Sequence, residues 1–324
     1  MNKNILVTGG AGFIGSHTCK ILHQAGYNPI VYDNLITGHR LFVKWGDFIH
    51  GDINDGNRLI EVFNRYRPAA VVHFAAHAYV GESVVKPAIY YKNNVAGTLS
   101  LLEAMRLASI DKIVFSSTCA TYGIPDDLPI KESHLQAPIN PYGRSKLMIE
   151  NILQDYRTAY EFNYVALRYF NAAGADPETE IGEDHDPETH LIPLVLETAA
   201  GKRDEIYIFG DDYETEDGTC VRDYIHVNDL ASAHVKALEY LLNGGESDAF
   251  NLANGQGYSV QEIVDAAKSV TNVDFPVVIK PRRPGDPPTL IGDASKADKI
   301  LGWKPEITNV EEIIDTAWRW VSKE

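Results

Sequence analysis

The chain has 324 residues, of which 44% are hydrophobic, and it carries a formal net charge of -16. This acidity opposes binding to nucleic-acid backbones and to anionic lipid, so we expect neither as a partner. No apolar stretch has the length of a membrane span, and the N-terminus lacks a signal-like apolar core. Cys19, Cys119 and Cys220 are odd in number and widely spaced, which favours free thiols and a cytoplasmic protein.

A buried strand, a glycine-rich turn and an amphipathic helix open the predicted fold. The apolar residues 5–7 indicate the strand, and residues 13–25 indicate a helix that Gly26 closes. Between them the sequence reads Gly9-Gly10-Ala11-Gly12-Phe13-Ile14-Gly15. In such turns the backbone N–H groups and the positive end of the helix face a pyrophosphate. We predict that Gly12, which has no side chain, lets a dinucleotide approach the backbone.

An acidic residue follows the second predicted strand, residues 29–32. The Asp33 carboxylate can accept hydrogen bonds from both hydroxyls of an adenosine ribose and would repel a 2′-phosphate. The cofactor is therefore expected to be NAD rather than NADP. The alternative is a tight strand-to-helix turn that binds no ligand.

Strand and helix signals then alternate, which favours an α/β fold with a doubly wound parallel sheet of the Rossmann type. We expect this NAD-binding domain over residues 1–171. Residues 172–324 are expected to form mainly a smaller C-terminal α/β lobe that binds substrate, with some segments returning to the first domain. The later predicted strands are 69–74, 112–116, 164–168 and 206–209, and the later helices are 88–109, 141–161, 191–200, 230–242, a capped helix from Ser259 through Ser269, and 310–321.

Three polar side chains form a candidate catalytic group. Tyr142 and Lys146 share one face of the predicted helix 141–161. The lysine ammonium and a positively charged nicotinamide ring would favour the phenolate and lower the pKa of Tyr142 toward neutrality. Thr118 follows the strand 112–116, at the sheet edge where open α/β sheets bind ligands. We predict that Tyr142 is the base and that Thr118 orients the substrate hydroxyl or relays its proton. An exposed helix pair without a catalytic role is the alternative.

These features resemble the extended short-chain dehydrogenase/reductases, through Thr8-Gly9-x-x-Gly12-x-x-Gly15, the strand-end threonine and the Tyr-x-x-x-Lys pattern. Over nearly its whole length the chain more closely resembles the UDP-galactose (UDP-glucose) 4-epimerases. The motifs that carry this resemblance are Val80-Gly81-Glu82-Ser83, Asn93-Asn94-Val95, Arg168-Tyr169-Phe170-Asn171, Thr215-Glu216-Asp217-Gly218-Thr219, Val221-Arg222-Asp223-Tyr224-Ile225-His226-Val227 and Arg282-Arg283-Pro284-Gly285-Asp286.

The resemblance implies a reaction without net oxidation or reduction. Tyr142 would take the proton of the sugar C4 hydroxyl while the C4 hydride passes to tightly held NAD. The flat 4-keto sugar would turn about its diphosphate and receive the hydride on its other face. A homodimer is also implied, with residues 88–109 and the helix that carries Tyr142 facing the partner.

The resemblance further implies the residues of two binding sites. Asp52 and Ile53 would flank the adenine, and Lys146 would also meet the nicotinamide ribose. The implied cofactor site consists of Gly9, Gly12, Phe13, Ile14, Gly15, Asp33, Asn34, Asp52, Ile53, Phe74, Ala75, Ala76, Asn93, Lys146 and Tyr169. In the UDP-sugar site, the diphosphate would be held by Asn171, Arg222 and Arg283, the uracil by Tyr207 to Phe209, the uridine ribose by Asp286, and other parts by Thr118, Tyr142, His190, Leu191, Tyr224 and Leu290.

Three positions depart from the family pattern. Ala78 replaces a lysine, which is expected to loosen one cofactor contact, and His190 replaces an asparagine near the sugar. Leu290 aligns with a tyrosine that some members place beside the C2 substituent of the hexose. Because leucine is shorter, we predict that the pocket accepts UDP-GlcNAc and UDP-GalNAc as well as UDP-glucose and UDP-galactose.

Other enzyme functions stay open on these residues. A UDP-pentose 4-epimerase would share the same machinery. A nucleotide-sugar dehydratase or decarboxylase needs an acid directly after the strand-end threonine, where this chain has Cys119 and Ala120. A non-catalytic NAD-binding sensor would not need Thr118, Tyr142 and Lys146 together. A UDP-hexose 4-epimerase is therefore the favoured function.

No metal site is predicted. The histidines lack the paired spacing of zinc sites, and His73 and His226 are expected to pack at strand ends. The acidic segment 175–189 lacks the ligand spacing of a calcium loop and is expected to be a solvated loop.

Overall fold

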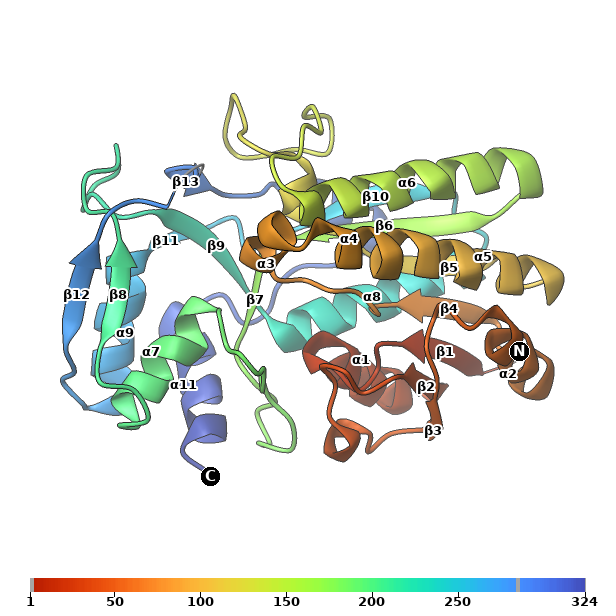
Figure 1. The fold of residues 1–324 in the computed structure, drawn as a ribbon, viewed down its shortest axis with the longest axis horizontal. Helices are drawn as coiled ribbons and strands as arrows, with labels where there is room; N and C mark the ends of the chain where they lie inside the picture. Colours follow the sequence, from red (N-terminus) through yellow and green to blue (C-terminus); the bar gives the residue numbers. More distant parts are fainter. Residues whose placement is uncertain (1–2, 284–285, 324) are drawn as a thin grey trace.

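The computed structural model describes residues 3–283 and 286–323. A parallel sheet forms the right-hand part of the molecule in Figure 1, with the strand order β10–β6–β5–β4–β1–β2–β3. The order reverses beside β1, and this is where doubly wound sheets bind ligands. The strands are β1 (Asn4–Thr8), β2 (Asn28–Asp33), β3 (Asp47–His50), β4 (Ala70–His73), β5 (Lys112–Ser116), β6 (Asn163–Tyr169) and β10 (Asp248–Leu252).

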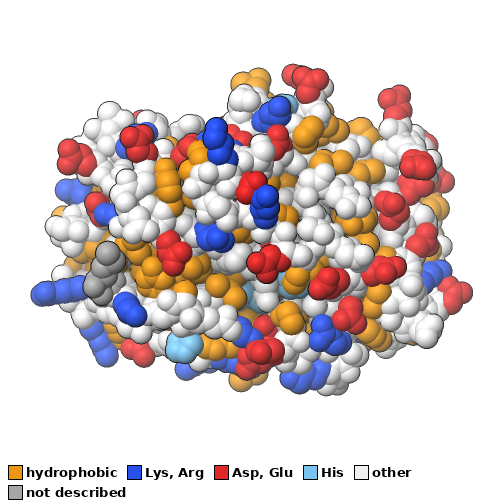
Figure 2. All heavy atoms as spheres, turned by 180° about the vertical axis from the view of Figure 1, so that it is seen from behind, with side chains coloured by type: hydrophobic (Ala, Val, Ile, Leu, Met, Phe, Trp, Pro, Cys, Tyr) orange, Lys and Arg blue, Asp and Glu red, His pale blue; other side chains and the backbone are white. Residues whose placement is uncertain are grey.

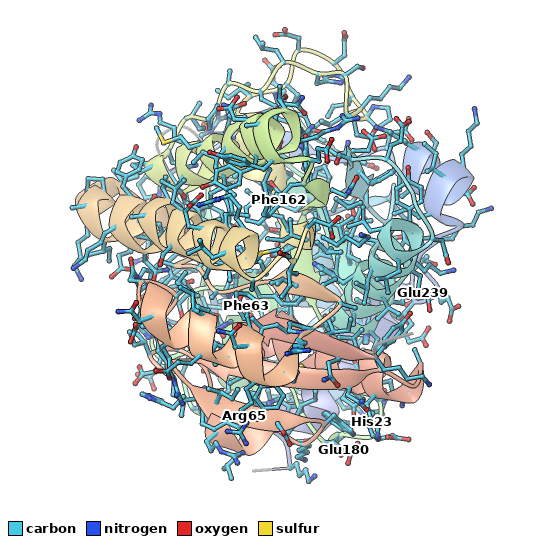
Figure 3. All side chains as sticks on the ribbon, turned by 90° about the vertical axis from the view of Figure 1, so that its right-hand side faces the viewer. His23, Phe63, Arg65, Phe162, Glu180 and Glu239 are labelled. Atoms are coloured by element: carbon cyan, nitrogen blue, oxygen red, sulfur yellow. The ribbon has the colours of Figure 1, made fainter. Side chains whose placement is uncertain are left out.

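Helices cover both faces of this sheet, so its strands are buried and apolar on both sides. One face packs against α1 (Phe13–Gln24), α8 (Val227–Leu242) and α10 (Ser295–Leu301). The other face packs against α2 (Gly56–Tyr66), α5 (Gly97–Leu107) and α6 (Pro141–Tyr160). Figure 3 shows these layers from the side, with Phe63 and Phe162 in the packed interior and Arg65 at the surface. The predicted Rossmann-type α/β sheet is confirmed.

A smaller lobe lies to the left in Figure 1. Its sheets are β11–β9–β13 with β7 paired to β9, and β12–β8. Their strands are β7 (Asn171–Ala173), β8 (Ile206–Phe209), β9 (Val221–His226), β11 (Gly257–Ser259), β12 (Val277–Lys280) and β13 (Thr289–Leu290). The apolar faces of α7 (Leu191–Ala199), α9 (Val260–Thr271) and α11 (Val310–Val321) form the core of this lobe.

The chain passes between the two parts more than once. After β9, α8 packs on α1, and β10 then pairs with β6 at the edge of the large sheet. The predicted helix 230–242 begins earlier than expected, because the His226 side chain accepts a hydrogen bond from Asn228 N and so caps α8. The capping box at Ser259 and Glu262 is present as predicted.

The helix predicted over residues 88–109 is not regular. Short helices α3 (Val80–Val85) and α4 (Pro87–Tyr90) lead into a π-helical turn, η2 (Tyr91–Ala96), before α5 begins. Asn94 lies in this turn, and its side chain bonds His77 N and O and Ser145 Oγ. Through Asn94, the π-helical turn is therefore joined to the segment after β4, which contains His77, and to α6, which contains Ser145. The 3-10 turns are η1 (Arg40–Phe42) and η3 (Cys119–Thr121).

The surface matches the acidic composition. Figure 2 shows acidic side chains spread across the rear face, most densely on the side of the smaller lobe. Among the residues that the structure describes, none of the helices combines the length and the apolar character needed to cross a membrane.

Candidate active site

The glycine turn between β1 and α1 combines two glycines that the fold requires with one that it does not. Gly9 has a φ of +72°, and a Cβ there would lie 2.6 Å from Ala75 N. A Cβ on Gly15 would collide with Gly9 O. A Cβ on Gly12 would meet only Gly9 O, at the ordinary contact distance of 3.4 Å. The open space above Gly12 is what a ligand that approaches the backbone requires.

The predicted adenosine end of the site is organised around two carboxylates. Asp33 ends β2, is 8% exposed, and accepts hydrogen bonds from Ala11 N (3.0 Å) and Leu35 N (2.8 Å). Burial raises the pKa of Asp33, and these two N–H donors oppose the shift. Asn34, the residue after Asp33, donates through Nδ2 to Asp52 Oδ2 at 3.0 Å, so the end of β2 is linked to the predicted adenine residue Asp52.

The remaining predicted cofactor residues follow the same edge of the sheet. Ile53 is buried, and a Cβ on Gly97 would meet it at 2.7 Å. Asn93 Nδ2 donates to Asn94 Oδ1 at 3.0 Å. The others are Phe13 and Ile14 at the start of α1, Phe74, Ala75 and Ala76 directly after β4, and Tyr169 at the end of β6. This arrangement fits an extended dinucleotide that runs from β2 past the glycine turn to β6.

The structure brings the three candidate catalytic side chains together. Asn140 accepts a hydrogen bond from Gly143 N at 2.8 Å and thereby starts α6, which carries Tyr142 and Lys146. Thr118 lies directly beyond β5, at the start of η3, which packs against α6. Lys146 Nζ lies 5.9 Å from the centre of the Tyr142 ring. The exposed-pair alternative is wrong, because Tyr142 and Lys146 are both buried.

The electrostatics of this group differ from the expectation. Burial raises the pKa of the Tyr142 phenol, and Thr118 opposes the shift only in part. Burial lowers the pKa of Lys146 to about 7, and its Nζ donates to the Ser116 carbonyl at 2.8 Å. The lysine alone therefore does not make Tyr142 a strong base. A bound positive charge near the phenol is needed to stabilise the phenolate.

The predicted substrate residues around β9 contact one another. Asn171 Nδ2 donates to the Asp223 carbonyl at 2.9 Å, and Asn171 pairs in register with the buried Tyr224. Arg222 forms an ion pair with Asp286 at 2.5 Å. Leu290 lies on β13, in register with Arg222 on β9. Its side chain packs against the same small apolar cluster as Cys119. The smaller lobe therefore packs near Cys119, the residue that follows the candidate catalytic Thr118.

A second group of predicted substrate residues lies on β8 and the loop after β12. Tyr207 and Phe209 have ring centres 6.3 Å apart, and the Arg283 guanidinium lies 4.0 Å from the Phe209 ring centre. Arg283 is exposed and Phe209 is half-buried, so this pair presents a cation and the edge of an aromatic surface to a planar, charged ligand. Pro284 and Gly285 of the same motif lie outside the described residues.

The acidic segment before α7 is a loop, as expected, but it is only partly solvated. The Glu183 and Glu188 side chains are only 7% and 6% exposed. His190 Nδ1 lies 2.9 Å from a carboxylate oxygen of each. Burial lowers the pKa of His190, but the two carboxylates outweigh burial and raise this pKa to about 10. His190 and Leu191 mark the start of α7, and His190 is held by the carboxylates rather than free to turn toward a sugar.

Three supporting residues were not singled out from the sequence. Asn94 braces the π-helical turn, as described above. Ser116 binds Lys146 through its carbonyl and Tyr169 OH through Oγ at 2.6 Å. Buried Asp223 accepts hydrogen bonds from three backbone N–H groups, those of Asn254, Gly255 and Gly292. Asp223 and Asn94 lie inside the quoted motifs, so the motifs contain positioning residues as well as ligand contacts.

The whole chain resembles known sequence families and solved structures. Residues 6–316 match the family model described as GDP-mannose 4,6 dehydratase. The UDP-glucose 4-epimerase of Rhizobium meliloti (strain 1021) is 56% identical over 99% of this chain and 98% of its own length. That of Halalkalibacterium halodurans is 52% identical over 98% of this chain and 95% of its own length.

Solved structures agree with these sequence relationships. The UDP-glucose 4-epimerase from Brucella ovis in complex with NAD has a TM-score of 0.96 and 56% identity, covering 98% of both chains. The UDP-Glc/GlcNAc 4-epimerase from Campylobacter jejuni has a TM-score of 0.87 and 44% identity, covering 99% of this chain and 100% of its own. With its glycine turn, its Thr118–Tyr142–Lys146 group and this identity along its full length, the chain belongs to the UDP-glucose 4-epimerase family.

Proposed function

We propose that this protein is an NAD-dependent epimerase that inverts C4 of UDP-glucose and UDP-galactose through a 4-keto intermediate. The observation that carries the proposal is that Thr118, Tyr142 and Lys146 are buried together at the sheet edge that holds the glycine turn. High identity to proteins named UDP-glucose 4-epimerase supports the same activity.

NAD is the cofactor that these residues fit. Gly12 leaves the turn open to a pyrophosphate, and Asp33 offers carboxylate oxygens at the end of β2. Related structures were crystallised with NAD. When bound, NAD accepts the hydride from C4 of the sugar and later returns it. Lys146 is buried beside the Ser116 carbonyl, where it can donate to a ribose hydroxyl.

Tyr142 and Thr118 handle the proton of the C4 hydroxyl. Thr118 opposes the rise in the pKa of the phenol, and the two hydroxyls together are proposed to pass the proton between the sugar and the protein. Because burial raises the pKa of Tyr142, the phenol is largely protonated until the positively charged cofactor is in place. The base is thus active in the loaded enzyme, where it is needed.

Arg222, Asn171 and Arg283 are proposed to bind the diphosphate. Arg222 is paired with Asp286, which is proposed to contact the uridine ribose. Bound substrate would separate this pair, because Arg222 would then bind the diphosphate and Asp286 would accept a hydrogen bond from the ribose. In a chain with a net charge of -16, such local cations are needed to attract an anionic substrate.

The alternatives differ in sugar or in chemistry. A related structure is described as bound to formylated UDP-arabinopyranose, which keeps a UDP-pentose substrate as the second candidate. For a dehydratase, an acid is required next to Thr118. Burial raises the pKa of the Cys119 thiol to about 12, so it is a poor proton donor. This disfavours the dehydratase activity suggested by the family model's description.

A homodimer is proposed through the layer formed by α5 and α6. Leu107 is 61% exposed and Met148 is 43% exposed, although both are large apolar side chains. Sedimentation should give about twice the 35.9 kDa chain mass for the wild type and the monomer mass for a Leu107→Glu/Met148→Glu variant. An Ile279→Glu control on β12 should stay dimeric. A monomeric wild type would contradict the proposal.

We propose that residues 1–171 form the NAD domain and that residues 172–324 form mainly the UDP-sugar lobe. We also propose that the protein is cytoplasmic. The three cysteines are free thiols, as a reducing compartment requires.

The direct test is turnover of UDP-galactose, UDP-GalNAc and UDP-arabinopyranose, read by product chromatography. We expect UDP-galactose to reach an equilibrium mixture with UDP-glucose and no net release of reduced cofactor. Failure to convert any of the three sugars would contradict the epimerase function. Conversion of the pentose alone would select the second candidate.

A further inference from the structure

The loop between β7 and α7 contains four side chains that converge on one point. His185 Nδ1 lies 3.2 Å from Glu183 Oε1 and 3.4 Å from Glu188 Oε2. His190 Nδ1 lies 2.9 Å from an oxygen of each carboxylate. The ligand atoms of all four residues lie within 4.8 Å of one another. In a tetrahedral site with bonds of about 2.0–2.1 Å, neighbouring ligand atoms are about 3.3 Å apart.

One of these atoms has no satisfactory partner in the protein. His185 Nδ1 is buried and, despite its two carboxylate neighbours, makes no well-aligned hydrogen bond with either. A buried polar atom without such a bond is costly and calls for an explanation. Its lone pair would instead reach the point that the other three ligand atoms share. We propose that Glu183, His185, Glu188 and His190 bind a divalent transition-metal ion of the zinc class.

The chemistry of the ligand set selects this class of ion. Imidazole nitrogen suits Zn²⁺ and its first-row neighbours, whereas Ca²⁺ and Mg²⁺ prefer a shell made of oxygen. Once both imidazoles have released their protons on binding, the two carboxylates balance the charge of one divalent ion. With four protein ligands the site is closed, which assigns it a structural rather than a catalytic role.

The protein holds these ligands in place from several sides. Trp320 Nε1 donates to the Glu183 carbonyl at 3.1 Å. Thr189 N and His190 N both donate to Glu188 Oε1, at 2.6 Å and 2.8 Å. Such outer contacts orient metal ligands before the ion binds.

The site adjoins the cofactor turn. The His185 ring packs edge-on against Phe13 and Tyr79, with ring centres 6.4 Å and 5.9 Å away. Phe13 is the first residue of α1, directly after Gly12. The ion would therefore fix the loop between β7 and α7 (Figure 1) against the NAD-binding end of the large domain.

A neighbouring acidic cluster provides a contrast. Asp176, Glu178 and Glu180 also lie close together, but the Lys20 ammonium already sits among them at 2.8, 2.6 and 2.9 Å. A fixed cation neutralises that cluster. The carboxylates of the four-residue site pair instead with His185 and His190, the two histidines that are also proposed ligands.

The test uses the full chain without an affinity tag, purified without chelator and incubated with Zn²⁺ before dialysis. Metal analysis should give about one zinc per chain for the wild type and for Glu178→Gln, the matched control in the neighbouring cluster. The Glu183→Gln/His185→Asn variant should lose the zinc while keeping its NAD content. Wild type without zinc, or a variant that binds as much zinc as wild type, would overturn the proposal.

Cobalt provides a measurement that does not depend on a variant's folding. Wild-type protein loaded with Co²⁺ should show the intense visible absorption of a tetrahedral site, and equimolar Zn²⁺ should abolish it. Only the weak absorption of octahedral Co²⁺ would contradict the four-ligand site. Neither readout requires turnover, so the result is independent of the epimerase function.

Discussion

At the scale of single residues, the site combines buried polar groups whose charge states depend on the ligands. Tyr142 has a raised pKa and Lys146 a lowered one, and in both cases burial is the largest cause. Groups with such shifts are typical of active sites. Burial therefore disfavours charge on both side chains where the cofactor and sugar are proposed to meet.

Replacing Tyr142 with phenylalanine should remove the base and keep the fold. Turnover of UDP-galactose should fall by at least about a hundredfold, as expected for the loss of general base catalysis. UDP binding and NAD content should persist, because neither needs the phenol. Tyr160→Phe, on the exposed end of the same helix, is the control and should keep full activity. Near-normal turnover of Tyr142→Phe would remove Tyr142 from the mechanism.

Asp33 is expected to determine cofactor identity. Asp33→Asn keeps an oxygen for one backbone donor but removes the charge, whereas Asp33→Ser removes most of the contact with Ala11 and Leu35. Both variants should weaken NAD binding and lower the discrimination against NADP, with the larger loss for serine. Titration of stripped protein with both dinucleotides measures this. Equal affinity of wild type for NAD and NADP would show that Asp33 does not select the cofactor.

Leu290 is expected to admit N-acetylated sugars. It is partly buried beside Arg222, and His190 is held by Glu183 and Glu188 rather than free to fill the space. Wild type should therefore convert both sugar pairs. Leu290→Tyr should lose most activity on UDP-GlcNAc and retain activity on UDP-glucose. An Ile279→Tyr control should change neither rate. Wild type inactive on UDP-GlcNAc would exclude this role for Leu290.

At the scale of elements, the position of the proposed catalytic pair, Tyr142 and Lys146, depends on how α6 begins. Asn140 caps its first turn, two residues before Tyr142. Asn140→Ala should cost about 1 kcal/mol of stability and also lower turnover, because Tyr142 shifts against Thr118. Asn309→Ala, which removes the cap of the distant α11, should cost similar stability at unchanged turnover. Equal turnover of the two variants would show that the Asn140 cap does not position Tyr142.

Local sequence predicts the elements that form without help from distant residues. The strand 112–116 was predicted with its observed bounds, since an apolar run lies between polar flanks. The polar strand β9 was missed, because its stability depends on pairing with three other strands. The π-helical turn was also missed, since it depends on contacts of Asn94 with residues 77 and 145. The buried state of Glu183 and Glu188 likewise depends on tertiary structure.

The same distinction holds for the site. The glycine turn, Asp33 and Tyr-x-x-x-Lys are local patterns, and each lies at the predicted sheet edge. The Arg222–Asp286 pair joins segments far apart in the chain, so the sequence identified its members only through family resemblance. The low pKa of Lys146 depends on burial that only the packed structure reveals.

At the scale of the whole molecule, the chain joins cofactor and substrate residues by crossing between its two parts. α8 and β10 return to the large sheet after β9 has contributed Arg222 and Tyr224. The two parts have separate apolar cores but are joined by these returning segments. This arrangement suits a reaction in which the cofactor stays bound and the sugar turns.

The central claim is that the hydride removed from C4 returns to the same sugar. The most direct measurement starts from UDP-galactose that carries deuterium at C4 and follows the product by mass spectrometry and NMR in ordinary water. We expect UDP-glucose that retains the deuterium at C4, with no net accumulation of reduced cofactor. Loss of the deuterium to solvent, or its recovery in released reduced cofactor, would contradict the claim.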